Sequence, residues 1–282
     1  MNKILAYTYE KMISKRNFST LKWNELLICL IGFMIGRINM LSGLNPLCVA
    51  YIGAAYQTKT LRRWNTIFIL LGILSVVQSF SQNIKYIAVI LMISLIRWYI
   101  EAMNHKVRLA GQAVITSLST LVIGIVIIAV TGFTLYDFIR LTLEVIFIFA
   151  LVFIYQKGIE ILLENKKTPL TSQQVVGVTV ILVSMLGGMV ELYIEFSQGG
   201  RIYIRDIICF FLIIAISYLG GAAVSASMGT VIGTLLVMIG YIPAHLIGMY
   251  ALSGLCGGLF QTIGKASTVI GVLAGHMAGI YF

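Results

Sequence analysis

Long apolar runs with few charged residues recur from Leu26 to the last residue, and short polar connections separate them. Each run approaches the roughly 20 residues that an α-helix needs to cross about 30 Å of hydrocarbon. The pattern predicts an all-α polytopic membrane protein with about 10–11 transmembrane helices. The candidate segments, with boundaries good to about four residues, are 26–44, 46–57, 65–82, 84–100, 113–131, 137–156, 174–193, 206–222, 224–240, 243–260 and 266–282.

The composition agrees with a chain that lies almost wholly in the membrane. Of 282 residues, 59% are hydrophobic and only 11% are charged, whereas a soluble domain carries about 25% charged residues. This excludes a water-soluble fold. We therefore divide the chain into a basic N-terminal tail, residues 1–25, and a multi-pass transmembrane domain, residues 26–282. The tail lacks a short apolar core followed by a small-residue cleavage site, so we expect no cleavable signal peptide.

The segment after Pro46 is short, and it reads either as a crossing helix or as one arm of a re-entrant hairpin. If every segment crosses, the basic tail shares one side of the membrane with most of the basic connections. Because Lys and Arg concentrate in short cytoplasmic loops, this arrangement favours a crossing and a cytoplasmic N-terminus. The cytoplasmic side would then hold fourteen basic residues: Lys3, Lys11, Lys15, Arg16, Lys22, Lys59, Arg62, Arg63, Lys106, Arg108, Lys157, Lys166, Lys167 and Lys265.

A net charge of +10 raises the question of nucleic-acid binding, but the placement of the basic residues argues against it. They occupy connections between apolar runs, and no basic face is interleaved with aromatic residues for stacking on bases. The four cysteines are isolated, and the three histidines lie on unrelated segments. We therefore predict no nucleic-acid partner, no metal site, no cofactor and no catalytic residue in this chain.

Charged residues inside the apolar segments are the candidate functional positions, because charge within a bilayer is costly and must be compensated. Arg37 falls in the middle of the first segment, and its partner is expected on another helix, with Glu144 or Glu191 as candidates. Arg140 and Glu144 are spaced for pairing within one helix, as are Arg97 and Glu101. Two interpretations stay open for such residues, a substrate or ion site and a tie between helices.

Small residues four positions apart form the second candidate feature. Such spacing places them on one helix face, where a neighbouring backbone can approach closely. Thirteen of the 27 glycines lie from Gly220 onward. We favour packing within one chain over contact between subunits, so a homo-oligomer stays possible. The helix-packing glycines predicted from this spacing are Gly32, Gly36, Gly229, Gly233, Gly271, Gly275 and Gly279.

Charged residues also cluster around the longest external connection, between two of the later segments. Arg201, Arg205 and Asp206 lie there together with Glu191 and Glu195. We interpret the connection as a solvated loop, because surface charge clusters are common without function. The alternative is a ligand-sensing module that signals to a separate partner.

Two stretches carry a family resemblance. They are GFMIGRINMLSGLNPLCVAYIGA at 32–54, and YLGGAAVSASMGTVIG at 218–233 with its continuation YALSGLCGGLFQTIGKASTVIGVLAG at 250–275. Together they resemble the N-terminal membrane domain of stage II sporulation protein E, over about residue 26 to the end. In that family the membrane domain precedes a cytoplasmic region that binds the tubulin-like division protein. A phosphatase of the PP2C type, expected to use manganese, follows and activates the forespore sigma factor after asymmetric division.

The resemblance implies that this chain anchors, localises and assembles such a phosphatase in the cell membrane, at the asymmetric division septum of a spore-forming bacterium. The phosphatase's AspGly pair has no counterpart, since Asp137 precedes Phe138 and Asp206 precedes Ile207. We therefore expect no catalysis by this chain. If all segments cross, Phe282 lies outside, and we expect a fragment, a split reading frame or an isolated domain. The alternative function is a small-solute transporter, suggested by Arg37, Glu144 and Glu191.

Overall fold

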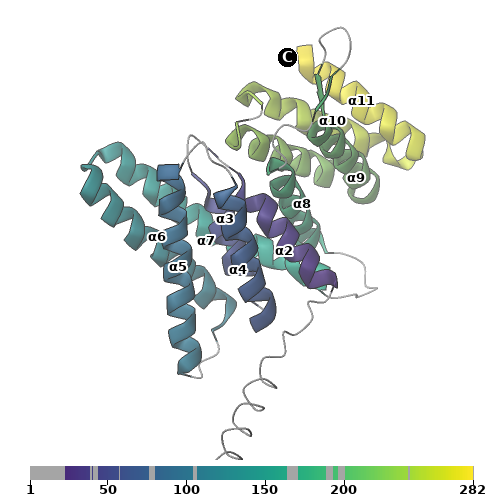
Figure 1. Cartoon of the computed structure of the whole chain (residues 1–282). Coiled ribbons are helices and arrows are strands. Elements are labelled where there is room, and N and C mark those ends of the chain that lie inside the picture. Colours follow the sequence, from purple (N-terminus) through teal and green to yellow (C-terminus); the bar gives the residue numbers. More distant parts are fainter. Residues whose placement is uncertain are drawn as a thin grey trace, which may run out of the picture.

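A computed structural model describes residues 23–38, 40, 44–56, 58–75, 80–103, 107–163, 171–188, 193–195, 201–240 and 242–281. Within these residues the chain is almost entirely helical, and its ten α-helices fall into two groups (Figure 1). The first group contains α2 (Trp23–Gly36), α3 (Pro46–Ala54), α4 (Lys59–Leu74), α5 (Phe80–Ala102), α6 (Leu109–Thr131), α7 (Leu135–Leu163) and α8 (Ser172–Gly187). The second contains α9 (Ile204–Met238), α10 (Ile247–Leu259) and α11 (Lys265–Tyr281), with short 3₁₀ turns at Ala244–Leu246 and Phe260–Thr262.

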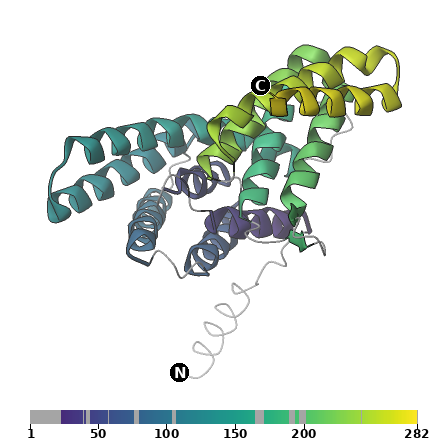
Figure 2. The same ribbon diagram turned by 90° about the horizontal axis from the view of Figure 1, so that it is seen from above.

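Four helices are long and apolar enough to cross a membrane: Asn83–Ala102 within α5, α6, α7 and α9. The other described helices are shorter, with 9 to 17 residues. This confirms the all-α polytopic fold class. Viewed from above, α6 and α7 form a hairpin that projects away from the remaining helices (Figure 2), and many of its apolar side chains are exposed.

The core of the first group is built around α3. All nine residues of this helix are buried, because helices α2, α4, α5, α6 and α7 contact it. The hydroxyl of Tyr51 donates to the carbonyl of Ile28 on α2 at 2.9 Å. The ring of Tyr51 meets Tyr155 of α7 edge to face, with 5.5 Å between centroids. A helix that is buried all round needs such internal partners, because it has no face left for lipid or water.

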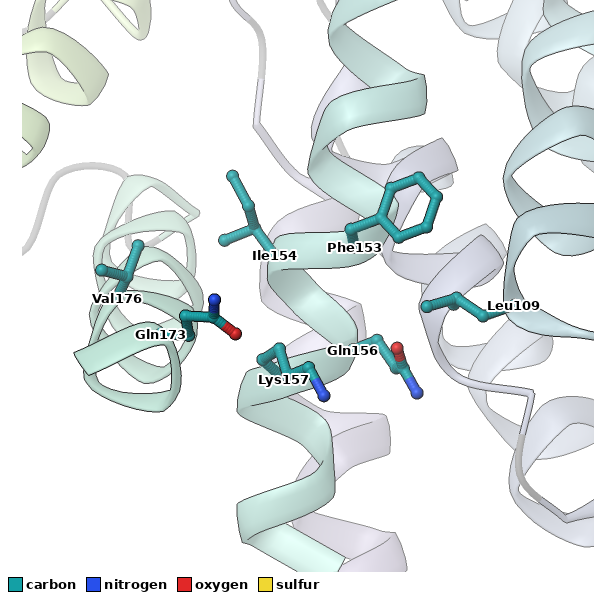
Figure 3. Close-up of a pocket in the computed structure, with 7 residues that line it drawn as sticks. All are labelled: Leu109, Phe153, Ile154, Gln156, Lys157, Gln173 and Val176. Atoms are coloured by element: carbon teal, nitrogen blue, oxygen red, sulfur yellow. The ribbon is translucent and has the colours of Figure 1, made fainter. Parts of the chain in front are cut away.

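Helix ends that carry basic residues meet at one end of the first group. Near the start of α2, Glu25 accepts a hydrogen bond from Thr58, the N-cap of α4, at 3.2 Å. Arg62 of α4 pairs with Glu101 near the end of α5. The start of α6, the last turns of α7 and the start of α8 line one pocket through Leu109, Lys157 and Gln173 (Figure 3).

The segment after Pro46 therefore runs back toward the end of the group from which α2 starts. Asn45 contacts the last carbonyls of α2, whereas Thr58 contacts its first turn. This is the direction that a crossing requires. Only nine residues are helical, which at 1.5 Å per residue gives a rise of about 14 Å. The helix itself is thus much shorter than the hydrocarbon thickness.

Helix α9 is interrupted at Gly221, where the backbone has φ 72° and ψ −176°. Only glycine adopts this conformation readily. The sequence predicted two segments, 206–222 and 224–240, and the interruption separates the helix at nearly that point. Ser217 before it and Ser225 after it both donate to the carbonyl of Gly254, at 3.3 and 2.6 Å. Both parts of α9 are thus hydrogen-bonded to the same carbonyl in the middle of α10.

A two-stranded antiparallel sheet precedes α9. Strand β1 (Tyr193–Glu195) pairs with β2 (Arg201–Tyr203), and Glu195 lies opposite Arg201. The sequence predicted only a solvated loop here. The alternating Tyr and Ile residues of both strands favour pairing, but strands of three residues are too short to show a periodic pattern.

Candidate functional site: a polar network among the membrane helices

Asn45 joins the end of α2 to the start of α3. Its side-chain nitrogen donates to the carbonyls of Ile35 and Gly36, at 3.3 and 3.2 Å. Its side-chain oxygen accepts from the backbone N–H of Cys48 at 3.2 Å, as expected for an N-cap residue before a proline at N1. One buried amide thus satisfies both helix ends, which would otherwise leave unpaired polar groups in the core.

Glu144 of α7 continues this network at the centre of the group. Its carboxylate accepts from the ammonium of Lys85 at 2.5 Å and from the hydroxyl of Tyr86 at 2.6 Å, and both donors belong to α5. The Tyr86 hydroxyl in turn accepts from the backbone N–H of Asn45 at 2.7 Å. The Glu144 side chain is 0% exposed, so its charge depends on these partners.

A second set of contacts surrounds Arg97, which is buried in α5. Its Nε donates to the side chain of Gln112 on α6 at 2.9 Å. Its terminal nitrogen donates to the carbonyl of Ile52, near the end of α3, at 3.1 Å. The predicted spacing partner, Glu101, pairs with Arg62 of α4. Partial burial and the nearby Arg63 lower the pKa of Arg62.

The sequence analysis expected Arg37 in the middle of a helix, but the structure places it just after the end of α2. Helix α2 ends at Gly36, and the backbone N–H groups of Arg37 and Ile38 bond three residues back, to Met34 and Ile35. The last turn of the helix is tightened in this way, and the side chain of Asn45 donates to the carbonyls of Ile35 and Gly36 at its end. The guanidinium lies 6.0 Å over the ring of Phe33. Its Nε is buried and has no hydrogen-bond partner among the residues that the structure describes.

The sequence analysis named Glu144 and Glu191 as candidate partners of Arg37. Glu144 is engaged by Lys85 and Tyr86, whereas Glu191 lies outside the described residues. Arg140, one turn before Glu144 on α7, lines two adjoining cavities together with it. The structure therefore brings Arg140 and Glu144 together.

The late glycines lie where helices α9, α10 and α11 cross. A Cβ atom at Gly229 would lie 2.2 Å from the carbonyl oxygen of Tyr250, and at Gly233 it would lie 3.1 Å from the Cα atom of Ile247. On α11, a Cβ atom at Gly271, Gly275 or Gly279 would lie 2.7, 2.5 or 2.5 Å from the nearest backbone atom of α10. These helices approach so closely that no side chain fits between them.

The early glycines lie at the crossing of α2 and α4. A Cβ atom at Gly36 would lie 2.6 Å from the carbonyl oxygen of Ile69, and at Gly32 it would lie 2.3 Å from the side-chain oxygen of Asn65. A Cβ atom at Gly72 of α4 would lie 2.2 Å from the carbonyl oxygen of Phe33 on α2. The spacing in α2 is therefore matched by a glycine on the facing helix.

The remaining charged and titratable candidates occupy separate places. Arg205 pairs with the adjacent Asp206 at 2.9 Å and lies 5.1 Å over the ring of Tyr203. His276 of α11 meets the ring of Phe210 edge to face. Among the described residues, no group of three or more His, Cys, Asp or Glu could hold a metal ion. This part of the chain does not fit the manganese that the family resemblance brings with its phosphatase.

A further cavity of about 390 Å³ opens at the basic end of the first group. Figure 3 shows Gln173 of α8 pointing toward Lys157 of α7, with Leu109 of α6 on the opposite side. The side chain of Gln156 lines the same cavity and donates to Glu160 at 2.5 Å. Its side-chain oxygen is buried and has no partner within the described part of the chain. Both apolar and polar residues line the cavity, and its described lining contains no acid–base pair.

Several residues of the network were not singled out from the sequence. The sequence analysis did not treat Lys85, Tyr86, Asn45 or Gln112 as site residues. Their positions carry a weak signal: each is polar and lies within or beside an apolar run. Their partners belong to other helices, and a single sequence does not show which helices are neighbours.

Comparisons with known proteins agree on one family. The family model described as "SpoIIE, N-terminal domain" matches residues 2–282. A curated relative, Stage II sporulation protein E of Bacillus subtilis (strain 168), is 23% identical over 274 residues, which cover 95% of this chain and 32% of the relative. The chain thus spans about a third of the length of the curated relative that it matches. No solved structure matches it significantly.

Proposed function

The chain belongs to the SpoIIE N-terminal domain family, and from this premise we propose that it is the membrane-anchoring, localisation and assembly domain of a regulatory serine phosphatase like stage II sporulation protein E. Membership confirms the resemblance drawn from residues 32–54 and 218–275. The phosphatase activity, its manganese and its action on forespore sigma-factor control would belong to parts of such a protein that this chain does not contain.

The observation that supports an anchoring role is that the buried polar groups bind one another between helices. Glu144, Lys85, Tyr86 and Asn45 bind one another across four helices, and Arg97 ties α3 to α5 and α6. Groups satisfied in this way hold helices together. A transport site would instead present such groups to a solute near the bilayer midplane.

In this proposal the chain acts by position. It would hold the cytoplasmic phosphatase at the asymmetric division septum, close to the tubulin-like division protein, and it would assemble there with septal proteins or with further copies of itself. The closely packed helices α9–α11 would provide a rigid end to the membrane domain, because glycines at the crossings remove side-chain freedom from the contact.

Localisation of the chain in sporulating cells tests the proposal. The chain is fused to a fluorescent protein and produced in sporulating Bacillus subtilis, next to an unrelated polytopic membrane protein that carries the same tag. We expect the chain to concentrate at the asymmetric septum and the control to outline the whole envelope. An even distribution of both proteins, together with uptake of a solute into proteoliposomes that contain the chain, would favour a permease.

A further inference from the structure

Two cavities adjoin beside the centre of the polar network, and neither is used by the proposed anchoring function. One has a volume of about 310 Å³ and lies between α5, α6 and α7. The other has a volume of about 530 Å³ and lies between α7, the connection before α3, and the end of α9. Both are lined by Leu44, Arg140 and Glu144. Their sizes fall in the range of about 300–1,000 Å³ that small-molecule sites occupy.

The smaller cavity combines an apolar wall with a cluster of charged side chains, two of them cations. Lys85 and Arg140 line it together with Asp137 and Glu144. The side chain of Glu144 is 0% exposed, and its two carboxylate oxygens accept from Lys85 and Tyr86. The carboxylate of Asp137 accepts from the hydroxyl of Thr134 at 2.5 Å. Lys85 is 18% exposed, and its ammonium has three donors, of which one is directed to Glu144.

The larger cavity is apolar along its length. Apart from Arg140 and Glu144 at one end, its lining is apolar or aromatic: Met40, Leu44, Pro46, Tyr136, Ile139, Leu143, Ile146, Phe147, Ala150 and Met238. A hydrocarbon chain fits such a lining, whereas a hydrated solute would lose its water without new hydrogen bonds.

Several residues that line the larger cavity are exposed on the surface of α7. Tyr136, Leu143 and Ile146 line it and are 72%, 63% and 60% exposed. They belong to α7, which is long and apolar enough to span the membrane. A ligand therefore reaches this cavity from the lipid phase, which distinguishes it from a water-soluble solute.

From this juxtaposition we propose that the two cavities form one binding site for a membrane phospholipid. Its phosphate lies in the smaller cavity against Lys85 and Arg140, because hydrogen bonds from Lys and Arg to phosphate are charge-assisted and strong. One of its acyl chains lies in the larger cavity along the apolar residues of α7. The phosphate of the phospholipid would pair with Lys85 and Arg140 at the edge of the polar network.

The test uses the full chain, purified in detergent, stripped of lipid and titrated with dioleoyl phosphatidylglycerol while bound lipid is counted by native mass spectrometry. Two variants address the two halves of the site. Arg140→Gln removes a cation from the phosphate end, and Ala150→Trp fills the acyl end. Two matched controls change exposed residues outside both linings, Arg63→Gln on α4 and Ala129→Trp on α6.

We expect the wild-type chain and both controls to retain a single phospholipid. Arg140→Gln should weaken binding by at least about tenfold, the effect of losing one hydrogen bond to a charged group, and Arg140→Lys should restore most of it. Ala150→Trp should abolish binding while the helical circular dichroism stays unchanged. Equal retention in all variants would overturn the proposal. Equal binding of diacylglycerol, which lacks the phosphate, or displacement of the lipid by inorganic phosphate alone would also overturn it.

Discussion

Lys85 and Glu144 form an ion pair in which the Glu144 side chain is 0% exposed, so water does not stabilise its charge. Removing one partner of a buried ion pair leaves the other uncompensated, at a cost of about 3–5 kcal/mol. We therefore expect Glu144→Ala to lower the unfolding temperature strongly in a detergent melt. The double variant Lys85→Met with Glu144→Leu should recover most of the loss, because it leaves neither charge unpaired.

A surface pair on the same helix provides the control for that prediction. Lys157 and Glu160 are 3.3 Å apart, and their side chains are 44% and 31% exposed. Exposed pairs contribute only about 0–1 kcal/mol, so Glu160→Gln should shift the melt little. If Glu144→Ala and Glu160→Gln shifted it equally, Glu144 would be open to water and the network would not depend on it.

Two arginines that look alike in the sequence differ in their contacts. Arg97 donates to Gln112 and to the carbonyl of Ile52, whereas the Nε of Arg37 is buried and the described ranges offer it no hydrogen-bond partner. Arg97→Met leaves two buried acceptors unpaired and should destabilise the protein by about 1–3 kcal/mol. Arg37→Met removes an unsatisfied group and should cost less than about 1 kcal/mol. Equilibrium unfolding of both variants measures the difference, and a larger effect at Arg37 would contradict the assignment.

At the scale of the element, the crossing of α9 and α10 depends on glycine at particular positions. A Cβ atom at Gly229 would lie 2.2 Å from a backbone oxygen of α10, whereas a Cβ atom at Gly248 would meet nothing within 4 Å. Gly229→Ala should therefore destabilise the protein by about 1–3 kcal/mol through overpacking. Gly248→Ala should be neutral or stabilising by up to about 1 kcal/mol. Thermal unfolding of the two variants compares them directly, and equal melting temperatures would show that α9 and α10 separate easily.

The helix boundaries could be predicted where a local signal fixes them, and not elsewhere. Asn45 and Pro46 indicate the start of α3, and Gly221 permits the interruption of α9. The end of α2 has no such signal, because Asn45 ends it by binding its carbonyls from outside the helix. The sheet at 193–203 was missed for a related reason, since its pairs join residues on either side of a connection.

The candidate site was predicted less completely than the fold, and the reason is physical. A charge inside an apolar run shows from the sequence that a partner is needed. The identity of the partner depends on which helices are neighbours, and a single chain does not encode that in any local pattern. Glu144 was therefore found, whereas its partners Lys85 and Tyr86 were not.

At the scale of the whole molecule, the first helix group has a basic end and an end with few basic residues. The contact of Thr58 with Glu25 joins the starts of α2 and α4. The pair Arg62–Glu101 joins α4 to the end of α5, which contacts the start of α6 through Arg97 and Gln112. Because basic connections favour the cytoplasm, we expect this end to face inward, together with the N-terminal tail.

Cysteine labelling in intact cells checks that orientation. In a variant whose four native cysteines are replaced by serine, Arg108→Cys probes the exposed start of α6, and Phe133→Cys probes the α6–α7 connection, where Phe133 is 70% exposed. A membrane-impermeant maleimide added outside should label the cysteine at 133 at once, and the cysteine at 108 only after permeabilisation. Because α6 is long enough to cross, the two positions must respond oppositely. The reverse pattern would place the basic end outside, and a phosphatase anchored from that side could not reach a cytoplasmic substrate.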